Sequence, residues 1–125
     1  MPAGRSVPVR LTRAMRLKSG RDFNQARQQG QRLSRGCLIA NWMMLPAGST
    51  SRLGVIAGRK LGMAVVRSRA RRLLRETFRL HQHDLRRPVN LVLIARPSIV
   101  GQSFAAVERD FIGAMRQAGL FKETS

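Results

Sequence analysis

The stretch Gly58–Arg79, "GRKLGMAVVRSRARRLLRETFR", interleaves arginines with apolar residues at helical spacing. Six arginines fall between Arg67 and Arg79, and the only acid among them is Glu76. Blocks of like charge repel one another and usually stay disordered. The apolar residues recur every three or four positions, which predicts an amphipathic helix from about Ala64 to Arg86, ended by Pro88. A folded helix with so many cations calls for an anionic partner.

A helical projection at 100° per residue separates the two residue types. The apolar face predicts packing on a sheet, and its members are Val66, Ala70, Leu73, Leu74, Thr77, Leu80 and His81. The opposite face is cationic, with Arg71, Arg72, Arg75 and Arg79 on it and Arg67 and Arg69 at its borders. Arginines four residues apart repel by a few tenths of a kcal/mol. A face of one sign is therefore more typical of a phosphate-binding surface than of a merely solvated one.

Apolar segments on both sides of this helix predict three strands. Two precede it, at about 35–46 and 52–60, and the short polar loop between them predicts antiparallel pairing. The third, at 89–97, is apolar enough to be buried on both faces. A short helix over 19–30 and an amphipathic helix over 103–120 complete the pattern. The fold class is α+β, a single-domain two-layer sandwich of a central β-sheet with helices, in the order α-β-β-(β)-α-β-α with the bracketed strand not assigned to residues.

The charge balance predicts a polyanionic partner. The chain has 125 residues, 24 basic and 6 acidic, and a net charge of +18. Such a field speeds association with polyanions, nucleic acid first and an anionic membrane second. We expect residues 1–15 to form a disordered basic arm and residues 16–122 to form one domain.

Other classes of protein fit the sequence poorly. A single cysteine, Cys37, excludes an internal disulfide and fits a reducing compartment. No apolar run approaches the roughly 18 residues of a membrane span, and no apolar signal core opens the chain, so a cytoplasmic protein is expected. The only histidines, His81 and His83, lie on different faces near the helix end, far from Cys37. Neither a catalytic site nor a metal site is expected in the protein.

The segment "RKLGMAVVRSRARRLLRETFR" resembles the signature of the bacterial ribonuclease P protein subunit. That signature has two basic residues, Gly, Ala-Val, an Arg-Asn-Arg triplet, further basic residues, then Leu-Arg-Glu and Phe-Arg. "RLKSGRDFNQARQQGQR" and "NLVLIARPSI" resemble the family's opening and last strand, so the resemblance covers about residues 16–120. Ser68 replaces the triplet's Asn and lacks the amide's paired donor and acceptor. Arg27 stands where some members have an aromatic residue.

The resemblance implies a fold and a division of labour. The fold would be ribosomal-protein-like, with a left-handed β-α-β crossover, although right-handed crossovers are the rule. A large RNA would remove the 5′ leader from precursor tRNA by hydrolysis, using Mg²⁺ held by the RNA. The protein would bind that RNA and the leader, as a monomer in a one-to-one ribonucleoprotein.

The resemblance also implies roles for single residues. The residues assigned to the catalytic RNA are Arg59, Lys60, Arg67, Ser68, Arg69, Arg71, Arg72 and Arg75. Those assigned to the leader cleft are Phe23, Arg27, Asn41 and Trp42. Phe23 has a competing role as a core anchor of the first helix, and Trp42 is core or cleft according to the strand face that it occupies. The competing functions are a structural ribosomal or rRNA-binding protein, a DNA-binding protein, a stand-alone nuclease and a membrane-surface helix.

Overall fold

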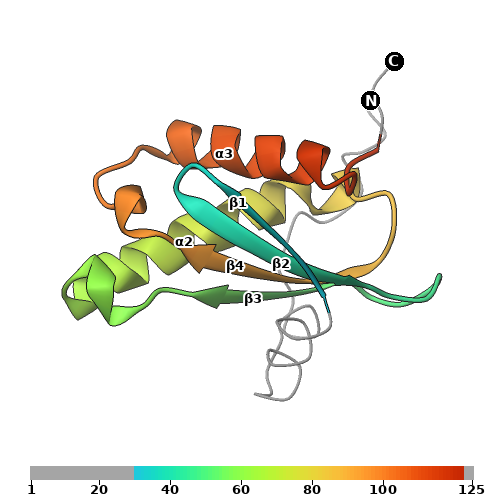
Figure 1. Ribbon diagram of the computed structural model, residues 1–125, viewed down its shortest axis with the longest axis horizontal. Helices are drawn as coiled ribbons and strands as arrows, with labels where there is room; N and C mark the ends of the chain where they lie inside the picture. Colours follow the sequence, from blue (N-terminus) through green and yellow to red (C-terminus); the bar gives the residue numbers. More distant parts are fainter. Residues whose placement is uncertain (1–29, 123–125) are drawn as a thin grey trace.

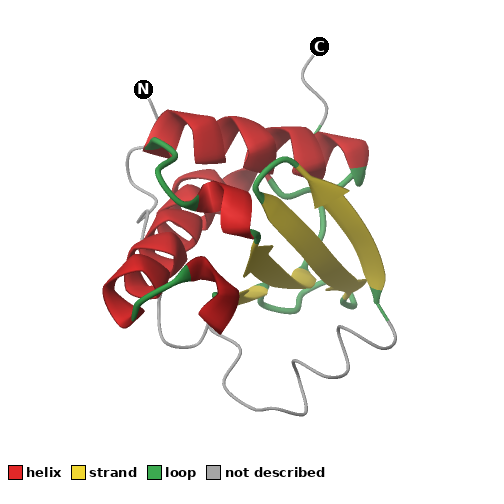
Figure 2. Ribbon diagram, turned by 60° about the vertical axis from the view of Figure 1, so that its left-hand side comes forward, coloured by secondary structure: helices red, strands yellow, loops and turns green. Residues whose placement is uncertain are grey.

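The computed structural model describes residues 30–122, which form two layers (Figure 1). One layer is a four-stranded sheet and the other consists of two α-helices, both packed on the same face of the sheet (Figure 2). The arm expected at 1–15, most of the helix expected over 19–30, Phe23 and Arg27 lie outside the described residues. The strands are β1 (Gln31–Arg35), β2 (Leu38–Met44), β3 (Arg52–Ile56) and β4 (Val89–Ala95), and the α-helices are α2 (Ala64–His81) and α3 (Phe104–Gln117).

The sheet has the order β1-β2-β4-β3, with β4 inside it. β2 runs antiparallel to β4, with Trp42 opposite Leu91, while β3 runs parallel to β4. The prediction that the first two apolar strands pair with each other is therefore wrong, because β4 lies between β2 and β3. The mostly apolar sequence of β4 suits this central position. Five consecutive residues from Val89 are buried, as predicted for a strand covered on both faces.

β1 is the strand that the sequence did not locate. It carries the sequence QRLSR, in which only Leu33 is apolar, and four of its five residues are exposed. A two-residue turn of Gly36 and Cys37 joins it to β2. Gly36 has φ +56°, which suits the first central position of a tight hairpin turn. A Cβ at Gly36 would also lie 2.1 Å from Oδ2 of Asp110, whose carboxylate accepts the Cys37 backbone N–H at 3.0 Å.

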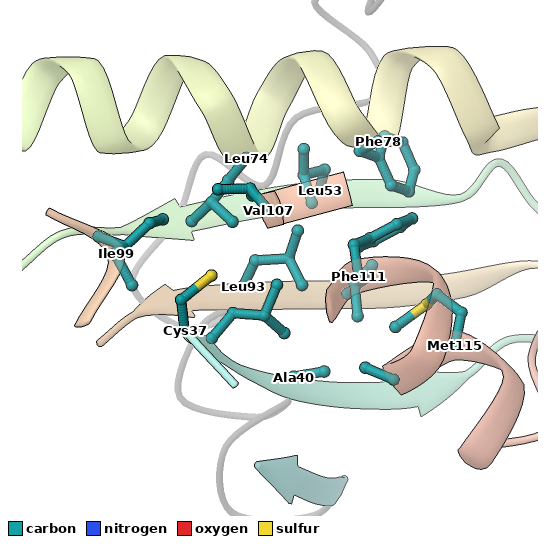
Figure 3. Close-up of a cluster of buried hydrophobic side chains, with 14 of the residues drawn as sticks. Cys37, Ala40, Leu53, Leu74, Phe78, Leu93, Ile99, Val107, Phe111 and Met115 are labelled. Carbon is teal, nitrogen blue, oxygen red and sulfur yellow. The ribbon is translucent and has the colours of Figure 1, made fainter. Parts of the chain in front are cut away.

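The hydrophobic core fills the space between the sheet and the two helices (Figure 3). Leu74 and Phe78 of α2 and Val107, Phe111 and Met115 of α3 meet the strands there. All five side chains are at most 1% exposed. Burying one such side chain stabilises the fold by roughly 1.5–3 kcal/mol. This packing, rather than the intrinsic stability of an arginine-rich helix, holds α2 in place.

α2 ends earlier than predicted and is rotated relative to the prediction. It stops at His81, and the 3₁₀ turn η4 (Gln82–Asp84) follows, so the predicted extension to Arg86 is wrong. Its buried residues are Ala70, Leu74, Thr77 and Phe78, whereas Leu80 is 42% exposed. The buried stripe is thus turned by roughly 50° from the predicted face, on the side of Phe78. The large Phe78 ring dictates this rotation, because it is buried in preference to Leu80.

The segment from β3 through α2 to β4 is a crossover between parallel strands. It confirms the expected strand–helix–strand unit, and its left hand stays a prediction. Among the helices of residues 30–122, none is both long and apolar enough to cross a lipid bilayer.

Candidate nucleic-acid interface

A short cationic lead-in connects β3 to α2. Arg59 and Lys60 lie exposed in the 3₁₀ turn η3 (Arg59–Leu61). Gly62 follows with φ +125°, a conformation that favours glycine. α2 then begins without a side-chain cap at Met63 and without an acid in its first turn. The partial positive charge of the helix N-terminus therefore adds to the charge of the two side chains.

The first three turns of α2 carry what we call the cationic face. It consists of Arg67, Arg69, Arg71, Arg72 and Arg75. Arg69 and Arg72 are exposed, while the other three are half-buried because the buried stripe is rotated towards them. The predicted RNA-binding residues therefore form one continuous stretch of η3 and α2.

Hydrogen bonds orient several of these arginines. Nη2 of Arg71 donates to Oγ of Ser68 at 3.3 Å, so the two predicted residues lie in contact. Nη2 of Arg69 donates to the backbone carbonyl of Gln102 at 3.1 Å. The Nε of Arg67 is buried and has no hydrogen-bond partner, which leaves one donor unused. Guanidinium groups of this kind can bind phosphate oxygens in a bidentate manner.

The far end of α2 is different, because its cations are paired with carboxylates. Nε of Arg79 donates to Oε1 of Glu76 at 3.0 Å, and a second bond joins Nη2 to Oε2. These hydrogen bonds lower the pKa of the Glu76 carboxyl and raise the pKa of Arg79. The four-residue spacing of Arg79 from Arg75 predicts repulsion between them. Because Glu76 pairs with Arg79, the charge of Arg79 is compensated within the helix. Within residues 30–122, no salt bridge involves Arg67, Arg69, Arg71 or Arg72.

His81 joins the end of α2 to two acidic residues. Its Nδ1 lies 3.1 Å from Oδ2 of Asp84, and its Nε2 lies 2.7 Å from Oε2 of Glu108 on α3. Burial lowers the pKa of the imidazole, but the hydrogen bonds and charges of Glu108 and Asp84 outweigh it, so the pKa of His81 is raised. Both ring nitrogens are occupied and the ring packs near Phe111, as suits a structural cation rather than a general base.

Within residues 30–122, Cys37 and the acidic residues form no second candidate for a catalytic or metal site. Burial raises the pKa of the Cys37 thiol to about 12, which makes it a poor nucleophile and a poor metal ligand at neutral pH. Within the part of the chain that the structure describes, no cluster of three or more His, Cys, Asp and Glu side chains could hold a metal ion.

The two faces of the sheet separate Asn41 from Trp42. Trp42 shares the helix-covered face with Leu38 and Ala40, is 5% exposed and belongs to the hydrophobic core. The core alternative therefore holds for Trp42, and its side chain does not reach the face assigned to the leader. Asn41 lies on that opposite face, next to Val92, and is 1% exposed. Its Nδ2 donates to the Gln31 carbonyl at 3.4 Å, while its Oδ1 has no hydrogen-bond partner.

Residues outside the predicted set also shape this interface. The carbonyl of Gln102 fixes Arg69, and Val100 lies beside the same helix turn. Sequence patterns contain no signal for the Gln102 contact, because a backbone carbonyl is present at every residue. The exposure of Val100 could have been suspected from its place between Ile99 and Gly101, at the start of a loop.

Comparison with known proteins gives one consistent result. The family model described as "Ribonuclease P" matches residues 11–119. The chain is 36% identical over 111 residues to the ribonuclease P protein component of Syntrophomonas wolfei, covering 89% of this chain and 92% of the relative. It is 35% identical over 112 residues to that of Symbiobacterium thermophilum, covering 90% and 97%. The chain belongs to the ribonuclease P protein family. It is thus a component of ribonuclease P, an endoribonuclease of tRNA processing.

Solved ribonuclease P proteins share this fold. The Staphylococcus aureus protein superposes with a TM-score of 0.79 at 23% identity, covering 88% of this chain and 100% of the other. The Thermotoga maritima protein superposes with a TM-score of 0.72 at 25% identity, covering 82% and 96%. The α+β architecture predicted from the sequence is confirmed, and it places the ribonuclease P motif on η3 and α2.

Proposed function

We propose that this chain is the RNA-binding subunit of ribonuclease P and that it holds the catalytic RNA through Arg59, Lys60, Ser68 and the cationic face. The supporting observation is the cationic face itself. Its cations repel one another along a helix whose opposite side is packed in the hydrophobic core. Four of these five arginines make no salt bridge within the described residues. RNA phosphates would relieve that repulsion and release counterions on binding.

The catalytic step is assigned to the RNA subunit in this proposal. The described residues support that division, because His81 has both ring nitrogens occupied and the Cys37 thiol is buried with a pKa of about 12. Mg²⁺ would be held by the RNA and its substrate. The protein would contribute positive charge, which lowers the Mg²⁺ concentration needed to bring two polyanions together.

The 5′ leader of precursor tRNA is proposed to bind on the sheet face that carries Asn41. Asn41 and Asn90 are buried on this face and their Oδ1 atoms have no hydrogen-bond partner, so both would lie in the floor of the cleft beneath the leader. Phe23 and Arg27, which the family motif assigns to the same cleft, lie outside the described residues. Trp42 is left out of the proposed cleft because it is part of the core. We further propose a monomeric protein in a one-to-one ribonucleoprotein, acting in the cytoplasm.

A reconstitution experiment tests this function. Purified protein and its cognate ribonuclease P RNA would be combined at low Mg²⁺ with a precursor tRNA, and 5′-leader cleavage would be measured. Protein alone and RNA alone are the controls. We expect cleavage only in the mixture. If the protein adds nothing to the RNA, the proposal fails and the structural rRNA-binding alternative takes its place.

A further inference from the structure

An apolar groove lies next to the cationic face, between the first turns of α2 and the loop from β4 to α3. It has a volume of about 210 Å³. Pockets for drug-sized ligands measure roughly 300–1,000 Å³, so this groove suits a smaller group. The residues that line it are Val66, Arg69, Ala70, Ile99, Val100 and Gly101.

Exposed apolar residues lie at the groove and at the start of α2 beside it. Val65 is 68% exposed and Val100 is 47% exposed, and Met63 at the start of α2 is 72% exposed. Within residues 30–122 only one other large apolar residue, Leu80, is comparably exposed, and it lies at the opposite end of α2. Several large apolar residues exposed at or near one end of a helix are typical of an interaction site.

Arg69 forms part of one wall of the groove, and its guanidinium group is held in place by a hydrogen bond. The hydrogen bond from Nη2 of Arg69 to the Gln102 carbonyl, 3.1 Å long, ties this side chain to the opposite side of the groove. This bond fixes the direction of the guanidinium group, which remains exposed beside the groove. A planar guanidinium group stacks well on a nucleobase.

The charge around the groove restricts what can occupy it. The two segments that form it, residues 57–75 and 96–105, contain no acid. Their basic residues are Arg59, Lys60, Arg67, Arg69, Arg71, Arg72, Arg75 and Arg96. A second copy of this chain, with its net charge of +18, would be repelled. The fitting partner is a polyanion that also carries flat apolar groups, and RNA with an unstacked base meets both conditions.

We propose that the groove binds one unstacked nucleobase of the RNA that the cationic face holds. The base would lie between the Arg69 guanidinium and the apolar wall of Val66 and Val100, with the adjoining phosphates on neighbouring arginines. This inference rests on the proposed function and deepens it. It adds a contact to a base at a defined place, where the arginines alone would follow only the phosphate backbone.

Two neutral substitutions provide a matched test in the full-length chain. Val100→Gln replaces an exposed apolar residue in the groove, and Leu80→Gln replaces one with similar exposure outside it. Val100 has an extended backbone, φ −63° and ψ 126°, so glutamine fits without strain. The measurements are the affinity for cognate ribonuclease P RNA, its salt dependence and the chemical reactivity of each RNA base in the complex.

We expect Val100→Gln to weaken binding about fivefold to tenfold, as for partial loss of a stacking contact. The salt slope should stay unchanged because no phosphate contact is removed. One base that the wild-type protein protects from dimethyl sulfate or carbodiimide should become reactive again. Leu80→Gln should bind within about twofold of the wild type and keep that protection, since it leaves the groove intact.

Three outcomes overturn the inference. The first is equal effects of the two substitutions, and the second is an unchanged protection pattern with Val100→Gln. The third is binding of the wild-type protein to anionic phosphatidylglycerol vesicles that Val100→Gln abolishes while RNA affinity stays the same. In all three cases the proposed function survives if the wild-type protein still activates its RNA. Loss of that activation in the reconstitution would instead refute the proposed function itself.

Discussion

The two halves of α2 treat positive charge in opposite ways. In the first half, Arg67, Arg69, Arg71 and Arg72 have no carboxylate partner in the described part of the chain. In the second half, Arg79 is bonded to Glu76, and His81 lies between Asp84 and Glu108. Both halves are fixed by the same hydrophobic core. Paired charges serve the fold at one end, whereas the unpaired charges at the other end are explained by a partner outside the chain.

The largest expected effect is the loss of RNA binding when the first half is neutralised. The triple substitution Arg67→Ala, Arg71→Ala and Arg72→Ala should weaken binding to ribonuclease P RNA roughly 100-fold, at about 1 kcal/mol for each contact. Each single substitution should lower the slope of log affinity against log salt by up to about one. Filter binding at several salt concentrations measures both quantities.

The control for this prediction lies in the second half of the same helix. Arg79→Ala removes a cation that Glu76 already compensates, so it should weaken RNA binding less than about threefold. Circular dichroism should show that the triple variant stays folded, because alanine is a better helix former and relieves repulsion. The proposed difference between the two halves of α2 would be contradicted if the triple variant were unfolded. It would also be contradicted if the triple variant and Arg79→Ala lost RNA affinity equally.

The next effect concerns stability, and it belongs to the second half. The folded-state pKa of His81 is raised above its ordinary value of 6.5. Its contribution to stability is therefore complete below about pH 6.5 and is lost as the pH rises through the folded-state pKa. His81→Gln should lower the free energy of unfolding by about 1–2 kcal/mol at pH 6 and by less at pH 8.5. Urea titrations at the two pH values measure this difference.

Glu108→Gln offers the matched substitution, because Oε2 of Glu108 lies 2.7 Å from Nε2 of His81. It removes one of the two carboxylates beside the imidazole, so it should also lower stability more at pH 6 than at pH 8.5. RNA affinity of His81→Gln at pH 7 should change less than about twofold, since its charge serves the fold. A large loss of RNA affinity in His81→Gln would place the second half in the interface as well.

Much of the difference between the two halves of α2 could be predicted from the sequence. The contacts that could not be predicted join residues far apart in the chain. The placement of the arginines on an amphipathic helix, the buried character of β4 and the amphipathic α3 were all predicted from the residue pattern and were confirmed. The pairing of Arg79 with Glu76, three residues apart, follows a local helix rule and could have been predicted. The contact between His81 and Glu108 could not, because it joins residues 27 positions apart.

Errors in the sheet and in the helix rotation arise from tertiary choices. β1 was not located because its only apolar residue is Leu33, and it is held at the edge by backbone pairing with β2. The pairing of β2 with β3 was wrong because β4 is the strand that benefits most from burial on both faces. The rotation of α2 depends on whether Phe78 or Leu80 is buried, and helical spacing alone does not decide between them.

A smaller effect is expected at Ser68, within the first half. Its Oγ accepts a hydrogen bond from Arg71, and the family motif has Asn at this position. Ser68→Asn should tighten RNA binding about threefold, because an amide offers both a donor and an acceptor to RNA. The salt slope should stay the same since the charge does not change. Ser68→Ala is the matched comparison and should bind no better than the wild type.

The smallest effect is expected when an arginine in the second half of α2 loses its carboxylate partner, so that it resembles the four arginines named above for the first half, which have none within residues 30–122. Glu76→Gln removes the carboxylate that pairs with Arg79 and leaves that guanidinium able to bind a phosphate. RNA affinity should rise about twofold, and the salt slope should steepen by up to about one. Asp84→Asn is the control, since it raises the net charge by the same amount at a side chain that is 59% exposed and pairs with His81 instead of with an arginine. If both substitutions tighten binding equally, total charge rather than pairing along α2 governs affinity. If only Glu76→Gln does so, Glu76 sets the boundary of the phosphate-binding surface.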